Sequence, residues 1–320
     1  MIDRSYASDV GPLAVRERHD VLAGHAVIGA HRPLTCRWPG AVDPAGVVVF
    51  CHGLGSSGGE YAALSTHWAR HGYLVIHPTF ADSMGAVARA EPLLGLDPDS
   101  DLTGWTAMPA VRARMHEILH TPSVWLGRVA VIRAVMDAID AIALATCGTP
   151  VASLRCAIAG HSFGAYAAQL LAGAEIELPD GQTGRFRDTR FNAAVLLSAQ
   201  GRDQQGLHGN AWASMDGPVL TVTGTLDRGA KAGDWRWKAE PFNFAPAGGK
   251  YLMVLDDADH FMGGFADRAG QRQVPAQREA LRQVSLAFLD AQLRNSEAAL
   301  QWLGSVAGTV AGCPVLFKRK

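Results

Sequence analysis

The chain has 320 residues, of which 48% are apolar and 18% charged, and its formal net charge is −1. This length can bury a sizeable core, and the composition is that of a globular protein rather than a disordered one. The near-zero charge argues against a nucleic-acid partner. Five cysteines without the spacing of a metal site predict free thiols. The first six residues lack the basic and apolar regions of a signal peptide, so we expect a cytoplasmic location.

The predicted elements alternate between strand and helix along most of the chain. In chain order they are strands over 13–21, 26–37 and 47–51, a helix over 60–71, a strand over 73–77, a strand ending before Gly160, a helix after Gly164, strands over 191–198, 219–223 and 251–255, and a helix over 277–293. Uninterrupted apolar strands are typical of a parallel sheet covered on both faces. We therefore predict an α/β fold with a mostly parallel central sheet, helices on both faces and one domain over residues 1–320.

Three stretches fall outside this alternation. Residues 82–122 are rich in proline and predict an irregular insertion or cap over the sheet, and residues 180–188 predict a polar surface loop. Residues 297–320 carry glycines at four-residue spacing in an uncharged run, which predicts a small-residue helix and a tail packed on the body. Membrane association of this segment is a second interpretation, and it is not favoured because polar residues dilute the run.

The turn Gly160-His161-Ser162-Phe163-Gly164 joins a predicted strand to a predicted helix and matches the pattern G-x-S-x-G. A serine on so tight a turn has a strained backbone, which is tolerable only when its neighbours two residues away lack a Cβ. The turn lifts Oγ of Ser162 clear of the sheet. This pattern predicts that Ser162 is a catalytic nucleophile.

A second match to the same pattern surrounds Ser57, but its strand ends several residues earlier. Ser57 stands three residues before Glu60 and just ahead of a predicted helix. This is the spacing of a capping box, so we expect Ser57 to cap that helix.

The segment His52-Gly53-Leu54-Gly55 leaves the end of a predicted strand. In an acyl-transfer enzyme such a loop supplies a donor to the oxyanion hole, so we expect the backbone N–H groups of Leu54 and Phe163 to form that hole. We expect His52 to hold the loop by hydrogen bonds rather than to transfer protons.

Two later strands are each followed by a residue that completes a Ser-Asp-His order. Asp227 follows the strand over 219–223 and is the predicted acid, and His260 follows the strand over 251–255 and is the predicted base. Asp203 is the rival acid. Three acids adjoin His260 in the sequence and are expected to shape its loop: Asp256, Asp257 and Asp259. The rival bases are His116, His120 and His208.

Aromatic residues near the predicted acid and base predict an apolar substrate pocket, for which the candidates are Trp235, Trp237 and Phe261. A pair of core or surface aromatics would explain them equally simply. The segment His116-Glu117-Ile118-Leu119-His120 matches the zinc motif H-E-x-x-H, but the residues that follow offer no third ligand, so we expect no metal site there.

The segments 52–55 and 160–164, with Asp227 and His260, together resemble the α/β-hydrolase superfamily over roughly Val47 to Leu293. Leu54 and Phe163 are similar to the branch that contains platelet-activating-factor acetylhydrolase-like, dienelactone hydrolase-like and cutinase-like esterases. The resemblance implies an α/β-hydrolase fold and a serine carboxylic-ester hydrolase that forms an acyl-enzyme, without a cofactor. The expected substrate is an apolar or medium-sized ester, lipid-like, polyester-like or a lactone. An amidase or peptidase using the same triad, and a non-catalytic binding protein, are the competing hypotheses.

Overall fold

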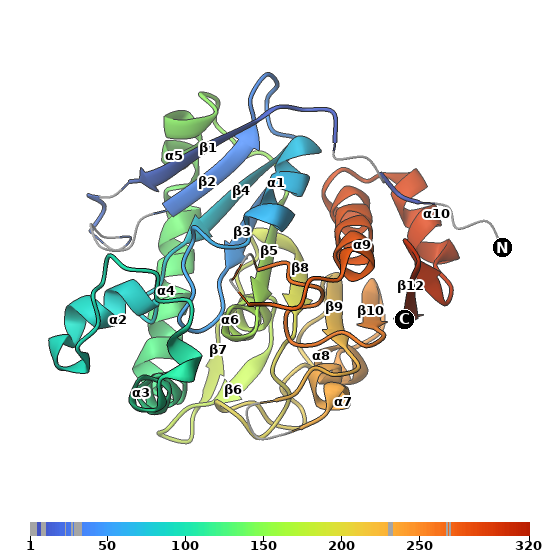
Figure 1. The fold of residues 1–320 in the computed structure, drawn as a ribbon. Helices are drawn as coiled ribbons and strands as arrows, with labels where there is room; N and C mark the ends of the chain where they lie inside the picture. The colour runs from blue at the N-terminus through green and yellow to red at the C-terminus, as the bar shows by residue number, and fades with distance from the viewer. Residues whose placement is uncertain are drawn as a thin grey trace.

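The computed structural model describes residues 5–7, 11–22, 24–26, 28, 34–229, 233–266, 268 and 270–320 (Figure 1). The strands of its large sheet are β1 (Val15–Val21), β2 (Leu34–Pro39), β3 (Gly46–Cys51), β4 (Tyr73–Pro78), β5 (Cys156–His161), β8 (Phe191–Leu197), β9 (Val219–Gly224), β10 (Lys250–Leu255), β11 (Thr309–Val310) and β12 (Cys313–Arg319). The helices are α1 (Ala62–Arg70), α2 (Met84–Ala90), α3 (Pro109–Leu119), α4 (Pro122–Asp137), α5 (Ile139–Thr146), α6 (Phe163–Leu171), α7 (Trp235–Lys238), α8 (Glu240–Phe244), α9 (Pro275–Leu293) and α10 (Glu297–Ser305).

The sheet has the strand order β1-β2-β4-β3-β5-β8-β9-β10-β12-β11. The six strands from β4 to β10 run parallel, whereas β1 and β2 at one edge and β12 and β11 at the other pair antiparallel. The predicted α/β class with a mostly parallel sheet is thus confirmed. Because parallel strands end at the same edge of a sheet, the loops after β3, β5, β8, β9 and β10 gather at one edge.

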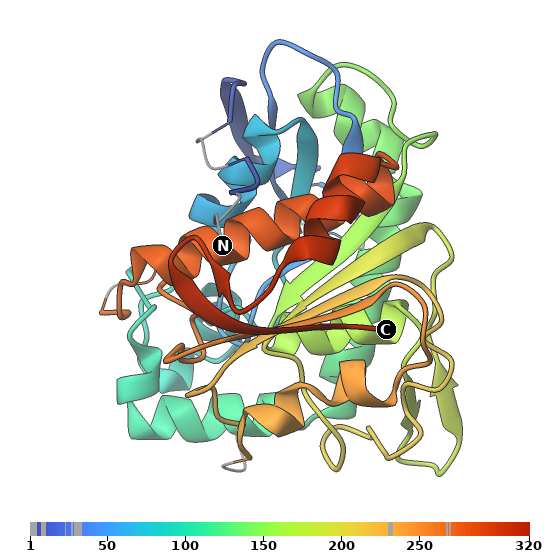
Figure 2. The same cartoon turned by 90° about the vertical axis from the view of Figure 1, so that its right-hand side faces the viewer.

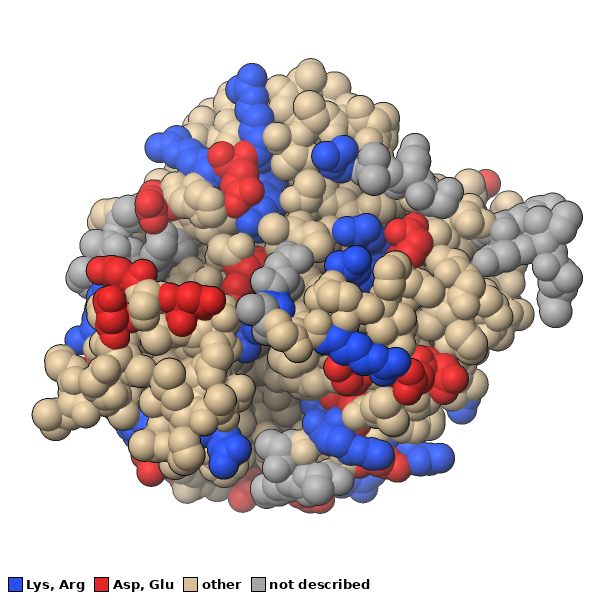
Figure 3. All heavy atoms as spheres, in the orientation of Figure 1, with Lys and Arg blue, Asp and Glu red and all other residues tan. Residues whose placement is uncertain are grey.

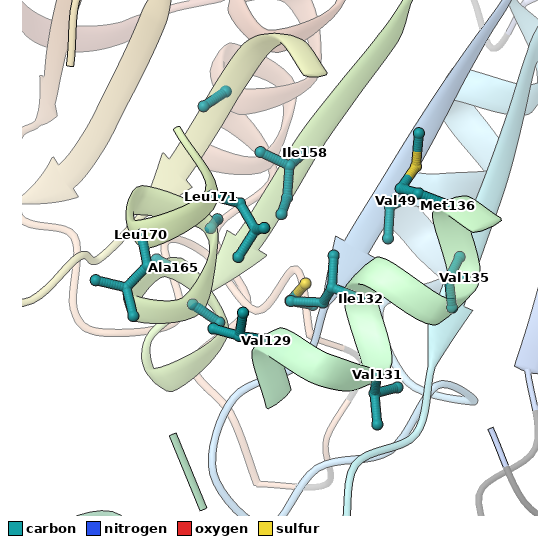
Figure 4. Close-up of a cluster of buried hydrophobic side chains, with 14 of the residues drawn as sticks. Val49, Val129, Val131, Ile132, Val135, Met136, Ile158, Ala165, Leu170 and Leu171 are labelled. Carbon is teal, nitrogen blue, oxygen red and sulfur yellow. The ribbon is translucent and has the colours of Figure 1, made fainter. Parts of the chain in front are cut away.

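Alternate side chains of β3 enter two different cores, as expected for a strand covered on both faces. Val47 and Val49 pack in the core beneath α4, α5 and α6, whereas Val48 and Phe50 pack in the core beneath α1 and α9. Figure 4 shows the first core, where Ile132 of α4 lies near Val49. Figure 2 shows α9 and α10 packed together over the opposite face.

Residues 82–122 are more regular than the sequence suggests, because they contain α2, α3 and two short 3₁₀ turns, Pro92–Leu94 and Trp105–Ala107. Met84, Val111 and Met115 give these elements a small apolar core of their own. The stretch 180–188 also contains a short strand, β7 (Thr183–Arg185), which pairs with β6 (Glu175–Glu177). Residues 82–122 are therefore not irregular, because local apolar contacts order them, and their role as an insertion or cap stays a prediction.

The C-terminal segment differs in a similar way. It forms the expected helix, α10, but the rest is a strand, β12, which pairs antiparallel with β10 and covers that edge of the sheet. The spacing of the glycines did not indicate a strand, because Gly308 and Gly312 lie in turns with positive φ values on either side of β11, before β12 begins.

All five cysteines are free thiols, as predicted. In Figure 3, basic and acidic side chains are interspersed over the face shown, in keeping with the small net charge.

The capping role expected of Ser57 is wrong. Helix α1 begins at Ala62 behind Tyr61, which is its N-cap residue and has a φ of 66°. The Ser57 N–H does donate to Glu60 Oε1 over 3.0 Å, but Ser57 Oγ accepts from the Gly59 N–H over 3.3 Å, before the helix starts. The motif therefore closes a turn in the loop rather than the helix end.

Candidate active site

Ser162 lies in the turn between β5 and α6 with a φ of 53° and a ψ of −117°, a conformation that residues with a Cβ rarely adopt. The flanking glycines make this turn possible. A Cβ on Gly160 would overlap the backbone of Gly164, and a Cβ on Gly164 would overlap the carbonyl oxygen of Cys51 at the end of β3. The predicted steric role of both glycines is thus confirmed, and the turn places Ser162 at the border of a pocket.

His260 and Asp227 follow the neighbouring parallel strands β10 and β9, and their side chains meet. His260 Nδ1 lies 2.9 Å from Asp227 Oδ1, and Thr223 Oγ1 donates a 2.9 Å hydrogen bond to Asp227 Oδ2. Asp227 is fully buried, whereas the His260 side chain is 31% exposed and borders the same pocket as Ser162. Because a carboxylate only accepts hydrogen bonds, a proton on Nδ1 suits this pairing and leaves Nε2 as a base.

The charge on Asp227 is maintained by its neighbours. Burial by itself raises the pKa of this carboxyl, but the Lys238 ammonium, 4.0 Å away, and His260 favour the ionised form and hold the pKa below its ordinary value. Lys238 is also buried, and burial lowers the pKa of its ammonium while Asp227 opposes that effect. Asp227 is therefore an ionised partner for His260 at neutral pH.

Ser198 is a second hydroxyl at this site, and sequence reasoning did not assign it a role. It follows β8 with a φ of 54°, is fully buried, and its Oγ lies 2.9 Å from His260 Nδ1. The same hydroxyl hydrogen bonds to Asp227 and contributes to lowering the pKa of that carboxyl. Its signal in the sequence is a polar residue that ends an apolar strand of the parallel sheet. Lys238, which was also missed, stands in a short polar and aromatic stretch and gives no such signal.

A chain of hydrogen bonds links the loop of His260 to the loop after β3. His161 Nε2 lies 2.9 Å from the carbonyl oxygen of His260, which can only accept, so this nitrogen carries the proton. His161 Nδ1 is left to accept from the Tyr61 hydroxyl over 3.1 Å, and Tyr61 in turn accepts from the Gly53 N–H over 3.1 Å. Burial holds the pKa of His161 well below its ordinary value, so the neutral ring remains in this role.

His52 has the structural role expected of it. Its Nε2 accepts a 2.9 Å hydrogen bond from the Phe80 N–H, so Nδ1 carries the proton and donates to the Gly53 carbonyl over 2.7 Å. Burial, assisted by the charge of Arg128, lowers the pKa of His52 to about 3. A ring that is neutral and bonded at both nitrogens fixes the backbone that leads into Leu54.

The pocket beside Ser162 and His260 has a volume of about 210 Å³. Leu54 borders it, as expected, and so does Trp237, whose Nε1 donates to the Arg202 carbonyl over 2.9 Å. Two other predicted pocket residues, Trp235 and Phe261, are not part of the lining. Trp235 packs on the apolar cluster around Phe242, and the Phe261 ring lies 5.3 Å from the His260 ring, edge to face.

The rival acids are exposed to solvent or have partners other than the His260 ring. Asp203 is exposed on the segment after β8. Asp257 forms an ion pair with Arg272, and Asp259 Oδ1 accepts a 2.9 Å hydrogen bond from the Phe261 N–H. These contacts fit the expectation that the acids near His260 shape its loop.

The H-E-x-x-H segment spans the end of α3, where the rings of His116 and His120 lie 4.5 Å apart. Glu117 forms an ion pair with Arg114 on the exposed side of the helix. No group of three or more His, Cys, Asp or Glu residues in the described part of the chain is arranged to hold a metal ion. A partly solvated helix face accounts for the motif.

Comparison of the chain with protein-family models gives no match, and comparison with curated proteins gives none either. Among the described helices, none has both the length and the apolar character needed to cross a lipid bilayer. The class that the structure establishes is a mixed α/β protein built on a large, mostly parallel sheet.

Proposed function

We propose that this protein is a serine hydrolase with an α/β-hydrolase fold, which cleaves carboxylic esters through an acyl-enzyme. One observation carries the proposal: Ser162, on a strained turn, shares a pocket with His260, whose Nδ1 faces the buried carboxylate of Asp227. Nucleophile, acid and base follow β5, β9 and β10, so all three are carried at the carboxyl edge of the parallel strands. This Ser-Asp-His order and placement support the superfamily that the motifs suggest.

In the proposed reaction, Ser162 Oγ attacks the ester carbonyl while His260 Nε2 takes the hydroxyl proton. Asp227 stabilises the imidazolium that forms and keeps its proton on Nδ1. The tetrahedral oxyanion receives hydrogen bonds from the backbone N–H groups of Leu54 and Phe163. His260 then returns the proton to the alcohol oxygen as the ester bond breaks. A water molecule repeats the sequence on the acyl-enzyme and releases the acid.

Two features support Leu54 and Phe163 in this role. Leu54 borders the pocket that contains Ser162, and Phe163 is the first residue of α6, where a backbone N–H has no partner in the preceding turn of the helix. The Phe163 N–H also lies at the positive end of the helix dipole, which favours a developing negative charge.

The decisive test is labelling of the intact protein with a fluorophosphonate, followed by peptide mapping. We expect the label on Ser162. The Ser162→Ala variant should not be labelled, and its rate of p-nitrophenyl ester hydrolysis should fall by on the order of 10⁴-fold or more. Ser57→Ala is the matched control, because Ser57 is the other serine in a G-x-S-x-G pattern. Labelling of Ser57, or undiminished hydrolysis by Ser162→Ala, would overturn the proposal. Anilides assayed beside the esters separate an esterase from an amidase.

A further inference from the structure

The pocket beside Ser162 is small and its lining is divided by chemistry. Leu54, Leu119 and Trp237 supply apolar surface, whereas the remaining side chains apart from Ser162 and His260 are two amides and two cations. Its volume of about 210 Å³ is below the range of about 300–1,000 Å³ typical of sites for larger ligands. A short group with a polar end fits this space better than a long alkyl chain.

Lys238 provides the first cation, and its ammonium has more N–H donors than it has neighbouring acceptors. It is 3% exposed, donates to the Ser198 carbonyl over 3.3 Å and lies 4.0 Å from Asp227 Oδ1. An ammonium group has three N–H bonds, so these two neighbours leave room for another acceptor. Asp227 is also engaged by His260, and it would face two cations whenever His260 is protonated.

The two amides belong to Gln200 and Gln204, on the segment that follows β8. Each is 4% exposed, and the Oε1 atom of each is buried without a hydrogen-bond partner in the described part of the chain. A buried amide oxygen that accepts no hydrogen bond is costly, and a side-chain amide can turn so that Nε2 rather than Oε1 faces a ligand. Both amides are therefore suited to bind a polar group of a ligand.

Arg228 adds the second cation. It follows Asp227 directly, is exposed to solvent and borders the same pocket, and no acidic side chain is among the described residues of the lining. The described lining therefore carries two positive charges and no negative one. Outside it, Asp227 lies 4.0 Å from Lys238, and Asp234 is close enough to Arg228 for that cation to lower its pKa. A negatively charged ligand group would balance this excess and could receive charge-assisted hydrogen bonds.

We propose that this pocket binds a short acyl group that ends in a carboxylate, so that the preferred substrates are monoesters of small dicarboxylic acids. This inference rests on the proposed ester hydrolysis at Ser162. Leu54, Leu119 and Trp237 contact the methylene chain, Lys238 and Arg228 pair with the carboxylate, and the two glutamines donate to it when their amides turn Nε2 toward it. It replaces the apolar substrate that the aromatic residues suggested.

Three ethyl esters of the same length and shape test whether the pocket prefers a negatively charged end on the acyl group. Monoethyl glutarate ends in a carboxylate, ethyl 4-carbamoylbutanoate in a neutral amide, and ethyl 5-methylhexanoate in an isopropyl group. We expect kcat/KM, measured by proton release at constant pH, to be about tenfold or more higher for the carboxylate than for either neutral ester. High salt should reduce the preference, because exposed Arg228 is screened.

Two variants identify the residues responsible. Arg228→Gln and Lys238→Met should each lower the ratio of kcat/KM for the carboxylate ester to that for the isopropyl ester by about fivefold or more. The ratio separates binding from any effect of Lys238 on Asp227, which would lower both rates together. Arg236→Gln is the matched control, because Arg236 is exposed on α7 and pairs with Asp234 outside the lining.

The outcomes are distinguishable from failure of the proposed function. If Ser162 is labelled by a fluorophosphonate but the isopropyl or amide ester is cleaved as well as the carboxylate ester, the proposed carboxylate-binding pocket is wrong and the proposed hydrolase stands. If the preference exists but survives both variants, the carboxylate binds elsewhere. If Ser162 is not labelled and none of the esters is cleaved, the proposed function fails first.

Discussion

The guanidinium of Arg128 lies over the ring of Phe163, 4.2 Å from its centroid. The same group donates to the carbonyl of His52 over 2.7 Å and forms a buried ion pair with Asp82, in which Nε lies 2.9 Å from Oδ1. Arg128 and Asp82 are each about 1% exposed. One side chain of α4 thus touches both segments from which the proposed oxyanion donors, at Leu54 and Phe163, extend.

We therefore expect Arg128→Lys to lower kcat for a neutral ester by about 10- to 100-fold, with a smaller change in KM. Lysine keeps the charge but cannot bond Asp82 through two nitrogens while also reaching His52. Small shifts of oxyanion donors cost rate rather than substrate affinity. Steady-state kinetics beside a melting curve provide the measurement. Arg133→Lys on the same helix is the control, because Arg133 donates to the Phe186 carbonyl. A fall in melting temperature with normal kcat would mean that Arg128 only stabilises the fold.

The acid is tested by comparing Asp227→Asn with Asp203→Asn. Asn at position 227 presents an amide that favours the wrong tautomer of His260 and cannot stabilise its imidazolium, so kcat should fall by about 10³- to 10⁴-fold at neutral pH with little change in KM. Asp203→Asn should leave kcat near that of the parent protein. Normal turnover by Asp227→Asn with a crippled Asp203→Asn would transfer the role of the acid to the segment after β8.

Ser198 calls for a separate prediction, because its hydroxyl lies as close to His260 Nδ1 as Asp227 does. It carries no charge, so it orients the ring and contributes little to stabilising the imidazolium. Ser198→Ala should lower kcat by only about 2- to 10-fold, and Ser198→Thr should recover part of that loss if the hydroxyl can be placed. A loss as large as that of Asp227→Asn would make Ser198 an equal partner of His260.

The site residues that could be predicted from the sequence are those whose positions are determined by the ends of the parallel strands. Ser162, Asp227 and His260 each directly follow or closely trail an apolar strand, and parallel strands bring such positions to one edge. Lys238 could not be predicted, because its contact with Asp227 depends on how α7 packs against β9. Arg128 lies in an amphipathic helix where an arginine normally faces solvent, and only its burial against Asp82 reveals its contacts.

In the fold, too, some elements could be predicted from local sequence pattern and others depend on contacts with distant parts of the chain. Long apolar strands and the helix over 277–293 were predictable from local pattern, because burial on both faces leaves a clear signal. Strand β12 was not, because Pro314 within it and Gly308 and Gly312 just before it argue against a strand, and the segment gains its structure from pairing with β10. The order within residues 82–122 also depends on contacts among α2, α3 and Trp105 rather than on propensity.

Acid should destabilise the protein through its buried histidines. Burial lowers the pKa of His52 and of His67 to about 3, while both titrate near 6.5 in the unfolded chain. Between these values the unfolded state binds more protons, so the free energy of unfolding falls as pH falls from about 6.5 toward 3, by about 1 kcal/mol per pH unit for each histidine. Urea unfolding at pH 7, 6 and 5 measures the slope. His67→Gln should reduce it, and an unchanged slope would contradict the prediction.

Gly164 provides a test of the turn that does not depend on the reaction. A Cβ at this position would overlap the carbonyl oxygen of Cys51, which belongs to β3 and cannot move without disturbing the strand pairing with β5. Gly164→Ala should therefore lower the free energy of unfolding by about 3 kcal/mol or more. Alanine is otherwise the better helix former, so helix propensity alone predicts the opposite sign.

Gly127 on α4 is the matched control, because it is exposed and a Cβ there meets nothing within 4 Å. Gly127→Ala should raise the free energy of unfolding by about 0.5–1 kcal/mol. Urea titrations of the two variants beside the parent protein measure both effects. If Gly164→Ala were as stable as Gly127→Ala, the close approach of β3 to α6 would be wrong. The position of Leu54 relative to Phe163 depends on that approach, so the proposed oxyanion site would be wrong with it.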